Sequence, residues 1–206
     1  MSFAILQSDP GWLPERRGRL TASRMNDACA YLKSGKEAES RRKYKIELVG
    51  ERMCDWAVSR YVTPAMQRGL DFEPEARRFY ETRTGNFVGP AALIHHQRIE
   101  FFSATPDGFV DDDGLLEIKV PTLPTYIEWL TGGEIPEEHV LQMTAQLAVT
   151  GRRWVDFAAY CPEMPETKRM FLRRMERDDE SIANCEVAAI QFLAEVEAMF
   201  EAVTTA

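Results

Sequence analysis

The chain has 206 residues, 45% of them hydrophobic, which is enough for one well-cored domain and short for two. It contains no apolar run long enough to span a membrane, and its start lacks the basic and apolar regions of a secretion signal, so a cytoplasmic protein with no membrane partner is expected. Its formal net charge of −8 argues at first sight against a nucleic-acid partner, because affinity for a phosphate backbone comes largely from Lys and Arg.

The charge is unevenly distributed along the chain. Residues 1–60 hold 12 Lys/Arg against 8 Asp/Glu, whereas residues 61–206 hold 13 against 25. We therefore expect the amino-terminal part to face DNA. The segment from Asp178 onward has seven acids and no Lys or Arg, so it should face away from DNA or pack on another subunit.

The cysteines are far apart in the chain and form no C-x-x-C pair. This spacing indicates neither a zinc site nor a disulfide framework, so buried reduced thiols are expected. The four cysteines are Cys29, Cys54, Cys161 and Cys185.

The first part of the chain has helical patterns. Thr21 and Ser23 are suitable N-caps for a helix that runs to about Tyr31. Apolar residues in the stretch 37–61 recur at roughly the helical period, which predicts a second helix.

A third helix and a group of strands follow. Pro74 is suited to the first position of a helix, which leaves Glu73 at that helix's entrance. Beyond it, short segments rich in Val, Ile, Leu and Phe indicate strands in a meander or hairpin, with a turn at 111–114 that joins the last two through residues 108–110. The strand segments are residues 87–94, 100–104 and 115–120.

The remainder of the chain alternates between helix and strand. The pattern predicts helices over 123–131 and 137–150, strands over 153–160 and 169–175, and a closing helix over 178–203. This order favours an α/β core in which helices flank a central mixed five-stranded sheet. No repeat, linker or domain boundary is visible.

Three residues in the middle of the chain are the principal candidates for chemistry. Glu117 and Lys119 are two apart in an expected strand and therefore share a face, whereas Ile118 points into the core. The hairpin return brings Asp107 beside them. Two carboxylates with a backbone carbonyl, that of Ile118, suit Mg²⁺, and Lys119 is placed to orient an attacking water and stabilise the transition state of phosphodiester hydrolysis.

A simpler interpretation of the same residues remains open. Asp107 can belong to an ordinary turn, and Glu117 and Lys119 can be an exposed cross-strand pair. The pattern P-D followed by E-x-K is short, so it does not decide between the two interpretations by itself.

The surrounding sequence resembles the lambda exonuclease and YqaJ-like viral recombinase family of the PD-(D/E)xK nuclease superfamily. The similarity extends from about Trp12 to about Pro162 and includes the order and spacing of the motifs. Residues 69–77 (GLDFEPEAR) resemble the family's G-x-x-x-E-x-x-A-R helix. Residues 104–109 (ATPDGF) resemble its S-P-D-G-L signature, with Thr105 in place of Ser. Residues 114–121 (GLLEIKVP) resemble its G-L-x-E-x-K-C-P strand, with Val120 in place of Cys.

This resemblance implies a restriction-endonuclease-like core and a site that uses Mg²⁺, with two ions per site and Mn²⁺ as a substitute. Glu73 adds a carboxylate to the metal site. Gln142 stands where the family carries a Gln beside the active site, although the family often has Gln-x-Gln and Thr144 occupies the second position here. Gln146 lies one turn further on and faces the same way. A Gln on the helix surface is the alternative for Gln142.

One position departs from the family pattern. Gln97 stands where some relatives carry an acid, so either a second metal is held differently or a neighbouring side chain substitutes. At most one of His95 and His96 can reach the site, because neighbours in a strand face opposite ways, and ordinary strand-surface positions are favoured for both.

Residues 12–23 (WLPERRGRLTAS) resemble the family's W-x-x-x-R-x-G-x-I-T-A-S opening, whose Arg and Ser bind a terminal 5′-phosphate. The resemblance assigns this role to Arg16 and Ser23, with Thr21 beside them and Lys33 reaching the same phosphate. A hydroxyl and free N–H groups at a helix start, with a guanidinium nearby, suit a phosphate whatever the base sequence. The alternative is that Thr21 and Ser23 only cap the helix and Arg16 is solvated.

The resemblance therefore implies a 5′–3′ exonuclease that acts on double-stranded DNA ends and leaves 3′ overhangs for phage-type recombination. It also implies a homotrimeric ring, a single-strand annealing protein as partner, and a phage or prophage origin. On this interpretation the domain 1–206 comprises a helical DNA-end-binding part (1–85), a catalytic sheet core (86–176) and a C-terminal helix (178–203). The alternatives are a structure- or site-specific endonuclease and an inactive DNA-binding module.

Overall fold

A computed structural model describes residues 5–6, 9–54 and 63–206. At its centre is a mixed sheet of five strands in the order β3-β6-β7-β8-β9. β6 (Gly108–Val110) and β7 (Gly114–Lys119) form an antiparallel hairpin, β7 runs parallel to β8 (Trp154–Tyr160), and β8 is antiparallel to β9 (Met170–Glu176). β3 (Val88–Gly89) pairs with β6 at the edge.

Helices cover both faces of this sheet. α4 (Pro64–Thr84) packs on one face, where its Ala76 and Tyr80 meet Leu116 and Ile118 of β7. α5 (Leu123–Gly132) and α6 (Glu137–Thr150) form the connection from β7 to its parallel neighbour β8 and cover the other face. Alternate residues of β7 therefore point to opposite helix layers, as the pleat of a strand requires.

A second, smaller sheet has four strands in the order β1-β4-β5-β2. It consists of β1 (Ile5–Leu6), β2 (Leu20–Thr21), β4 (Ala92–His95) and β5 (Phe102–Ala104). β2 and β5 are parallel, and Thr21 lies opposite Ser103. This sheet places the amino-terminal part of the chain against α6.

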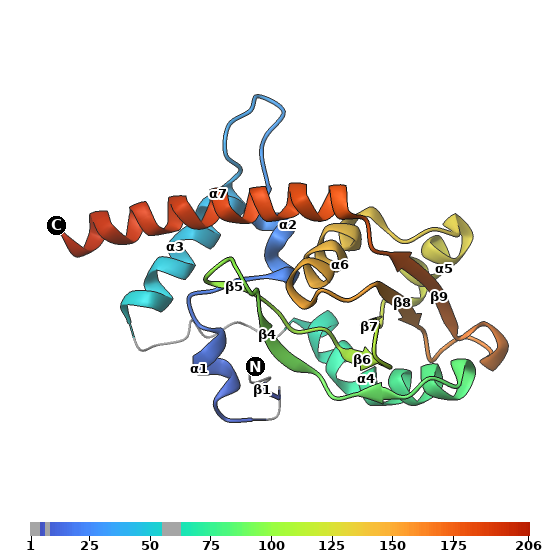
Figure 1. The fold of residues 1–206 in the computed structure, drawn as a ribbon. Coiled ribbons are helices and arrows are strands. Elements are labelled where there is room, and N and C mark those ends of the chain that lie inside the picture. The colour runs from blue at the N-terminus through green and yellow to red at the C-terminus, as the bar shows by residue number, and fades with distance from the viewer. Residues whose placement is uncertain (1–4, 7–8, 55–62) are drawn as a thin grey trace.

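The remaining helices form a layer beside the second sheet. α7 (Asp179–Thr204) is the longest helix of the described part, and it crosses α3 (Glu39–Met53) and α6 (Figure 1). Tyr44 of α3 stacks on Phe192 of α7, with ring centroids 5.4 Å apart. The short elements are α1 (Trp12–Arg16), η1 (Ala22–Arg24), α2 (Met25–Ala28) and η2 (Glu166–Lys168).

The structure confirms the α/β core with a five-stranded mixed sheet, and it confirms the elements expected after residue 120. The helices and strands expected there agree with α5, α6, β8, β9 and α7 to within one residue at each end. None of the helices described is both long and apolar enough to cross a membrane.

Several expectations for the first half are wrong. The helix expected from Thr21 to Tyr31 is the short η1 and α2, which end at Ala28. Thr21 occupies the N-cap position of η1, but its side chain makes no capping hydrogen bond, and Ser23 lies inside η1. Pro74 does not begin a helix but lies inside α4, which starts ten residues earlier where Thr63 caps the N–H of Met66. Proline's fixed φ suits a helix interior even though one hydrogen bond is lost, so packing along the rest of α4 overrides the local signal.

The strand predictions also need correction. Segment 87–94 divides into β3 and β4, which belong to different sheets, and 100–104 joins the second sheet, so the fifth strand of the central sheet is 108–110. Pro90 lies at the division, where it lacks the N–H that a continuing ladder requires.

The two remaining expectations are only partly met. Of the stretch 37–61, α3 occupies Glu39–Met53, and residues 55–61 lie outside the described residues. Cys161 and Cys185 are buried as expected, Cys29 is partly buried, and the expectation is wrong for Cys54, which is exposed.

Candidate active site

The hairpin of β6 and β7 brings Asp107, Glu117 and Lys119 together. Asp107 precedes β6, and its Oδ2 accepts a hydrogen bond of 2.6 Å from the backbone N–H of Ile118. The ammonium group of Lys119 donates to Oε1 of Glu117. Glu117 is only 1% exposed, so it is not part of an exposed cross-strand pair.

Two amide side chains of α6 hold the Glu117 carboxylate. Nε2 of Gln142 donates to Oε1 at 2.6 Å, and Nε2 of Gln146 donates to Oε2 at 2.5 Å. Gln146 is completely buried, and Gln142 points into the site and not to the helix surface. Each oxygen of Glu117 thus has its own amide donor, which fixes the orientation of the carboxylate.

Glu73 of α4 adds a third carboxylate to this region. Burial raises its pKa, Arg77 opposes this effect, and the negative charge of Glu117 adds to it. Burial and the charge of Glu117 also hold the pKa of Asp107 well above its usual range. Burial alone would lower the pKa of Lys119, but Glu117 and Asp107 outweigh it and the pKa is raised. Three carboxylates therefore share one ammonium group.

The donor chemistry of the site fits a hard divalent cation. Carboxylate oxygens are the ligands that Mg²⁺ prefers, and Mg²⁺ needs only one or two of them because it keeps waters and takes up substrate phosphate. Burial raises the pKa values of Asp107 and Glu73 and the charge of Glu117 adds to this effect, and a cation would relieve the repulsion among these carboxylates. Within the described part of the chain, no three His, Cys, Asp or Glu side chains already form a complete ligand set. Oε1 of Glu117 is in contact with Lys119, so a cation held by this oxygen would replace that contact.

A cavity of about 140 Å³ lies directly beside these carboxylates. Nη2 of Arg16 donates to Oγ1 of Thr21 at 3.4 Å, and Thr21 Oγ1 and Ser23 Oγ are 3.3 Å apart. The Thr21 hydroxyl therefore bonds to Arg16 and to the Ser23 hydroxyl and makes no capping hydrogen bond. The cavity is lined by Trp12, Arg16, Thr21, Ala22, Ser23, Thr105 and Asp107.

Two lining residues were missed at the level of the sequence. The hydroxyl of Thr105 and the indole N–H of Trp12 are buried and have no hydrogen-bond partner in the described structure. Buried donors are rarely left unpaired, so these two groups mark a place for a ligand that accepts hydrogen bonds. The available signal for Thr105 was its hydroxyl, which it shares with the Ser of the resembling motif.

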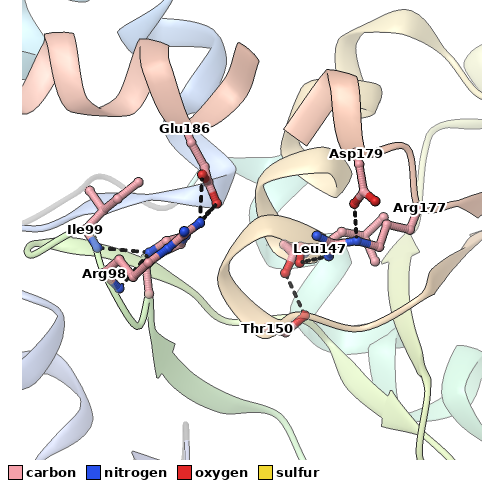
Figure 2. Close-up of polar contacts among 9 residues, drawn as sticks. Arg98, Ile99, Leu147, Thr150, Arg177, Asp179 and Glu186 are labelled. Carbon is pink, nitrogen blue, oxygen red and sulfur yellow. Dashed lines mark hydrogen bonds and ion pairs between the residues drawn. The ribbon is translucent and has the colours of Figure 1, made fainter. Parts of the chain in front are cut away.

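The histidines next to Gln97 do not contact the catalytic carboxylates. Nε2 of His95 lies 3.1 Å from Glu15, and Nε2 of His96 lies 3.1 Å from Glu186. The expected strand-surface position is wrong for His96, which is buried. Its Nδ1 accepts the backbone N–H of Arg98 and Ile99, so the turn it belongs to is held against Glu186 of α7, as Figure 2 shows. Gln97 itself is exposed.

Lys33 lies in the segment between α2 and α3. This segment projects beyond α7, on the side opposite α1 (Figure 1). The arrangement gives no support to a common phosphate for Lys33 and Arg16.

Several cations of the amino-terminal part are paired within the chain. Arg41 and Lys45 of α3 both bind Glu195 of α7, at 2.6 and 2.8 Å, and Arg52 binds Glu197 at 2.9 Å. The excess of positive charge in residues 1–60 therefore serves partly to attach α3 to the acidic helix. The expectation that it forms a DNA-facing surface is to that extent wrong.

A buried carboxylate and lysine pair on a mixed α/β sheet, beside a cavity of about 140 Å³, is consistent with a DNA nuclease. The family model described as YqaJ-like viral recombinase domain matches residues 11–153. The chain therefore belongs to the lambda exonuclease and YqaJ-like family and is a DNA exonuclease of the recombinase type.

Solved structures agree with this assignment. An alkaline exonuclease, LHK-Exo from Laribacter hongkongensis, is 40% identical, with a TM-score of 0.87 over 96% of this chain and 97% of its own. The same exonuclease in complex with dAMP gives a TM-score of 0.88 at the same identity and coverage. A phage related exonuclease from Haemophilus somnus 129PT shares the fold, with a TM-score of 0.64 and 12% identity over 88% of this chain and 96% of its own. No curated protein sequence matches the chain.

Proposed function

We propose that this protein is a Mg²⁺-dependent 5′–3′ exonuclease that digests one strand of linear double-stranded DNA and leaves a 3′ overhang for recombination by single-strand annealing. One observation carries the proposal: Asp107 both lines the cavity that holds Arg16 and Ser23 and belongs to the carboxylate cluster. A phosphate in the cavity therefore places the adjoining phosphodiester beside the groups that cleave it.

The residues of the cluster have distinct roles in this proposal. Asp107, Glu117, the carbonyl of Ile118 and Glu73 would hold one or two Mg²⁺ ions, for which Mn²⁺ substitutes. The metal would supply Lewis acidity and lower the pKa of a bound water. Lys119, once released from Glu117, donates to the charge that develops on the phosphate.

Recognition of the DNA end falls to the cavity. Arg16 supplies a charge-assisted hydrogen bond, and the hydroxyls of Thr21, Ser23 and Thr105 add neutral donors. None of these groups reads a base, so binding should depend on the terminal phosphate and not on sequence. Such a pocket sets the polarity, because it accepts the 5′ end of the strand to be digested.

The proposal extends to the assembly. A homotrimeric ring would keep a chain with a net charge of −8 on DNA by topology, and a single-strand annealing protein would take over the 3′ overhang. The related LHK-Exo was solved with dAMP, a mononucleotide, which is the class of product that an exonuclease releases.

The test is digestion of three labelled substrates with Mg²⁺, with and without EDTA. These are linear duplex with a 5′-phosphate, the same duplex with a 5′-hydroxyl, and closed circular duplex. We expect early release of a 5′ label from the phosphorylated linear DNA, slower digestion from the hydroxyl end, an intact circle, and no reaction with EDTA. A cut circle would favour the endonuclease alternative, early loss of a 3′ label would reverse the polarity, and no reaction at all would favour the inactive module.

A further inference from the structure

Arg77 ends the helix motif of α4 and contacts three parts of the site at once. It lies one turn after Glu73, and its side chain is 21% exposed. Nη1 donates to the carbonyl of Gly89 at 3.1 Å, and Nη2 donates to the carbonyl of Asp107. The same Nη2 lies 3.7 Å from Oε1 of Glu73.

These contacts fix the turn that presents Asp107. The carboxylate of Asp107 is held from one side by the N–H of Ile118, and its carbonyl is held from the other side by Arg77. The next residue is Gly108, where a Cβ would come within 2.3 Å of Val88 Cγ1 and 3.2 Å of Arg77 Nη1. The clash with Val88 is what restricts this position to glycine, and the guanidinium of Arg77 lies close to the backbone of the same turn.

The geometry requires arginine in particular. A planar guanidinium presents several donors in a fixed fork, so it can serve two carbonyls and a carboxylate together, whereas a lysine is a compact charge that cannot. The positive charge lies 3.7 Å from the carboxylate of Glu73, while its hydrogen bonds go to backbone carbonyls. It can therefore offset the charge of Glu73 without occupying the carboxylate oxygens of Asp107 that a metal would use.

We propose that Arg77 is a positioning residue for the nuclease reaction, which sets the distance between Asp107 and Glu73 by binding the carbonyl of the first and the carboxylate of the second. This inference rests on the metal site proposed above. A residue that orients metal ligands from behind typically changes metal affinity or activity by about 10–100-fold when it is removed.

The chain offers a matched control on the same helix. Arg83 of α4 also donates to a backbone carbonyl, that of Met170 in β9, but it does not contact the carboxylate cluster. Arg83→Gln removes the same type of tie between α4 and the sheet. It therefore reports what loss of such a tie does to stability alone.

The experiment titrates wild type, Arg77→Lys, Arg77→Gln and Arg83→Gln with Mn²⁺ by calorimetry and measures kcat and KM on 5′-phosphorylated duplex. We expect both Arg77 variants to bind Mn²⁺ about 10–100-fold more weakly and to lose kcat by a similar factor, with KM for DNA changed by no more than about twofold. Arg83→Gln should lower the Tm without changing either quantity. Arg77→Lys keeps charge and length, so it remains informative if Arg77→Gln does not fold.

Asp107→Asn, titrated in parallel, separates failure of the inference from failure of the metal site. If wild type binds Mn²⁺ and Asp107→Asn does not, but the Arg77 variants bind as wild type does, only the inference about Arg77 is overturned. The inference about Arg77 is also overturned if the Arg77 variants change only the Tm, as is expected for Arg83→Gln. If wild type shows no carboxylate-dependent binding, the proposed metal site fails and the role of Arg77 fails with it.

Discussion

At the scale of single residues, Glu117 is the most unusual feature of the molecule. A buried carboxylate is costly unless hydrogen bonds and a counter-charge compensate for lost water. Here Gln142, Gln146 and Lys119 supply both. A fold that needed only stability would do as well with an apolar side chain in this place, which supports the proposal that the arrangement prepares a carboxylate for a metal.

Substitution of the charged groups tests their chemical role. We expect Lys119→Met to lower kcat by about 100–1,000-fold, because it removes a cation aimed at developing negative charge. Asp107→Asn should abolish turnover, since it removes a proposed metal ligand. Digestion assays at saturating DNA check both, and thermal melts establish that the variants fold. Near wild-type digestion by either folded variant would contradict the assignment.

Because the hydroxyl of Thr105 has no partner in the described structure, its removal should leave stability unchanged or raise it but should weaken recognition of the 5′-phosphate. Thr105→Val removes a buried hydroxyl that has no partner, so the Tm should stay the same or rise. If the hydroxyl binds a phosphate, the preference for 5′-phosphate over 5′-hydroxyl ends should fall by about tenfold, as for a hydrogen bond of roughly 1.5 kcal/mol to a charged group.

Competing digestion of the two kinds of end measures this preference. Thr131→Val serves as a control, because the Thr131 hydroxyl bonds only to its own helix. An unchanged preference in Thr105→Val would remove Thr105 from the end-binding pocket.

The raised pKa values of the carboxylates predict how activity depends on pH. Only ionised carboxylates hold a cation, and burial raises the pKa values of Asp107 and Glu73 above their ordinary 3.8 and 4.5. Metal affinity should therefore weaken on acidification at a higher pH than these ordinary values would give, and more metal should restore activity because cations compete with protons. Mn²⁺ titrations across pH check this. Affinity that stays constant down to about pH 4.5 would contradict it.

At the scale of elements, prediction from sequence succeeded for segments whose pattern extends over many residues, and it failed for short segments whose structure is determined by packing against distant parts of the chain. The helices α6 and α7 and the strands β8 and β9 each extend over seven or more residues, with amphipathic helices and strands that contain runs of apolar residues, so their positions were predictable. β2, β3 and β6 have two or three residues each and exist because neighbouring strands pair with them. Such strands carry too few residues for a local pattern.

The residues of the candidate site likewise divide into those that the sequence predicts and those that only the structure identifies. The two-residue spacing of Glu117 and Lys119 fixed their common face from local geometry alone. Helical spacing put Gln146 on the same face as Gln142, but the contacts of Gln146 and Arg77 and the cavity beside Thr105 involve helices and turns that are distant in sequence, and no local rule identifies them. The sequence motif identified the region around Asp107, Glu117 and Lys119, whereas the contacts that hold these residues in place were identified only from the structure.

The attachment of α7 to α3 can be tested by Glu195→Gln. Arg41 is 3% and Lys45 10% exposed in the side chain, and both bind Glu195. The free energy of unfolding at pH 7 should fall by about 1–2 kcal/mol, less than for a fully buried pair, because Glu195 is partly solvated and Glu37 still pairs with both cations. Urea unfolding measures this, with Glu201→Gln as an exposed control on the same helix.

The effect of this substitution should depend on pH. The hydrogen bond from Arg41, opposed by burial and aided by Lys45, lowers the pKa of Glu195 from 4.5 to about 2. A lowered folded-state pKa contributes stability that is present above the unfolded value and is lost as the pH falls toward the folded value. The difference between wild type and Glu195→Gln should therefore narrow below about pH 4.5. A difference that widens on acidification would contradict the ion-pair account.

At the scale of the whole molecule, the acidic charge shapes how the protein can hold DNA. Because α7 pairs with three amino-terminal cations, Arg41, Lys45 and Arg52, these are not free for the phosphate backbone, and we propose that binding depends also on the end pocket and on assembly. We expect light scattering to give about three times the 23.6 kDa subunit mass. A monomer that still digests long duplexes without dissociating would contradict the ring.

The account as a whole depends on a cation between Asp107 and Glu117. The most direct measurement is the anomalous diffraction of crystals soaked in Mn²⁺. We predict a peak within bonding distance of both carboxylates, with Glu117 released from Lys119, and no such peak in Asp107→Asn. Electron density that shows wild-type Glu117 still bound to Lys119 at saturating Mn²⁺, with no peak beside Asp107, would contradict it.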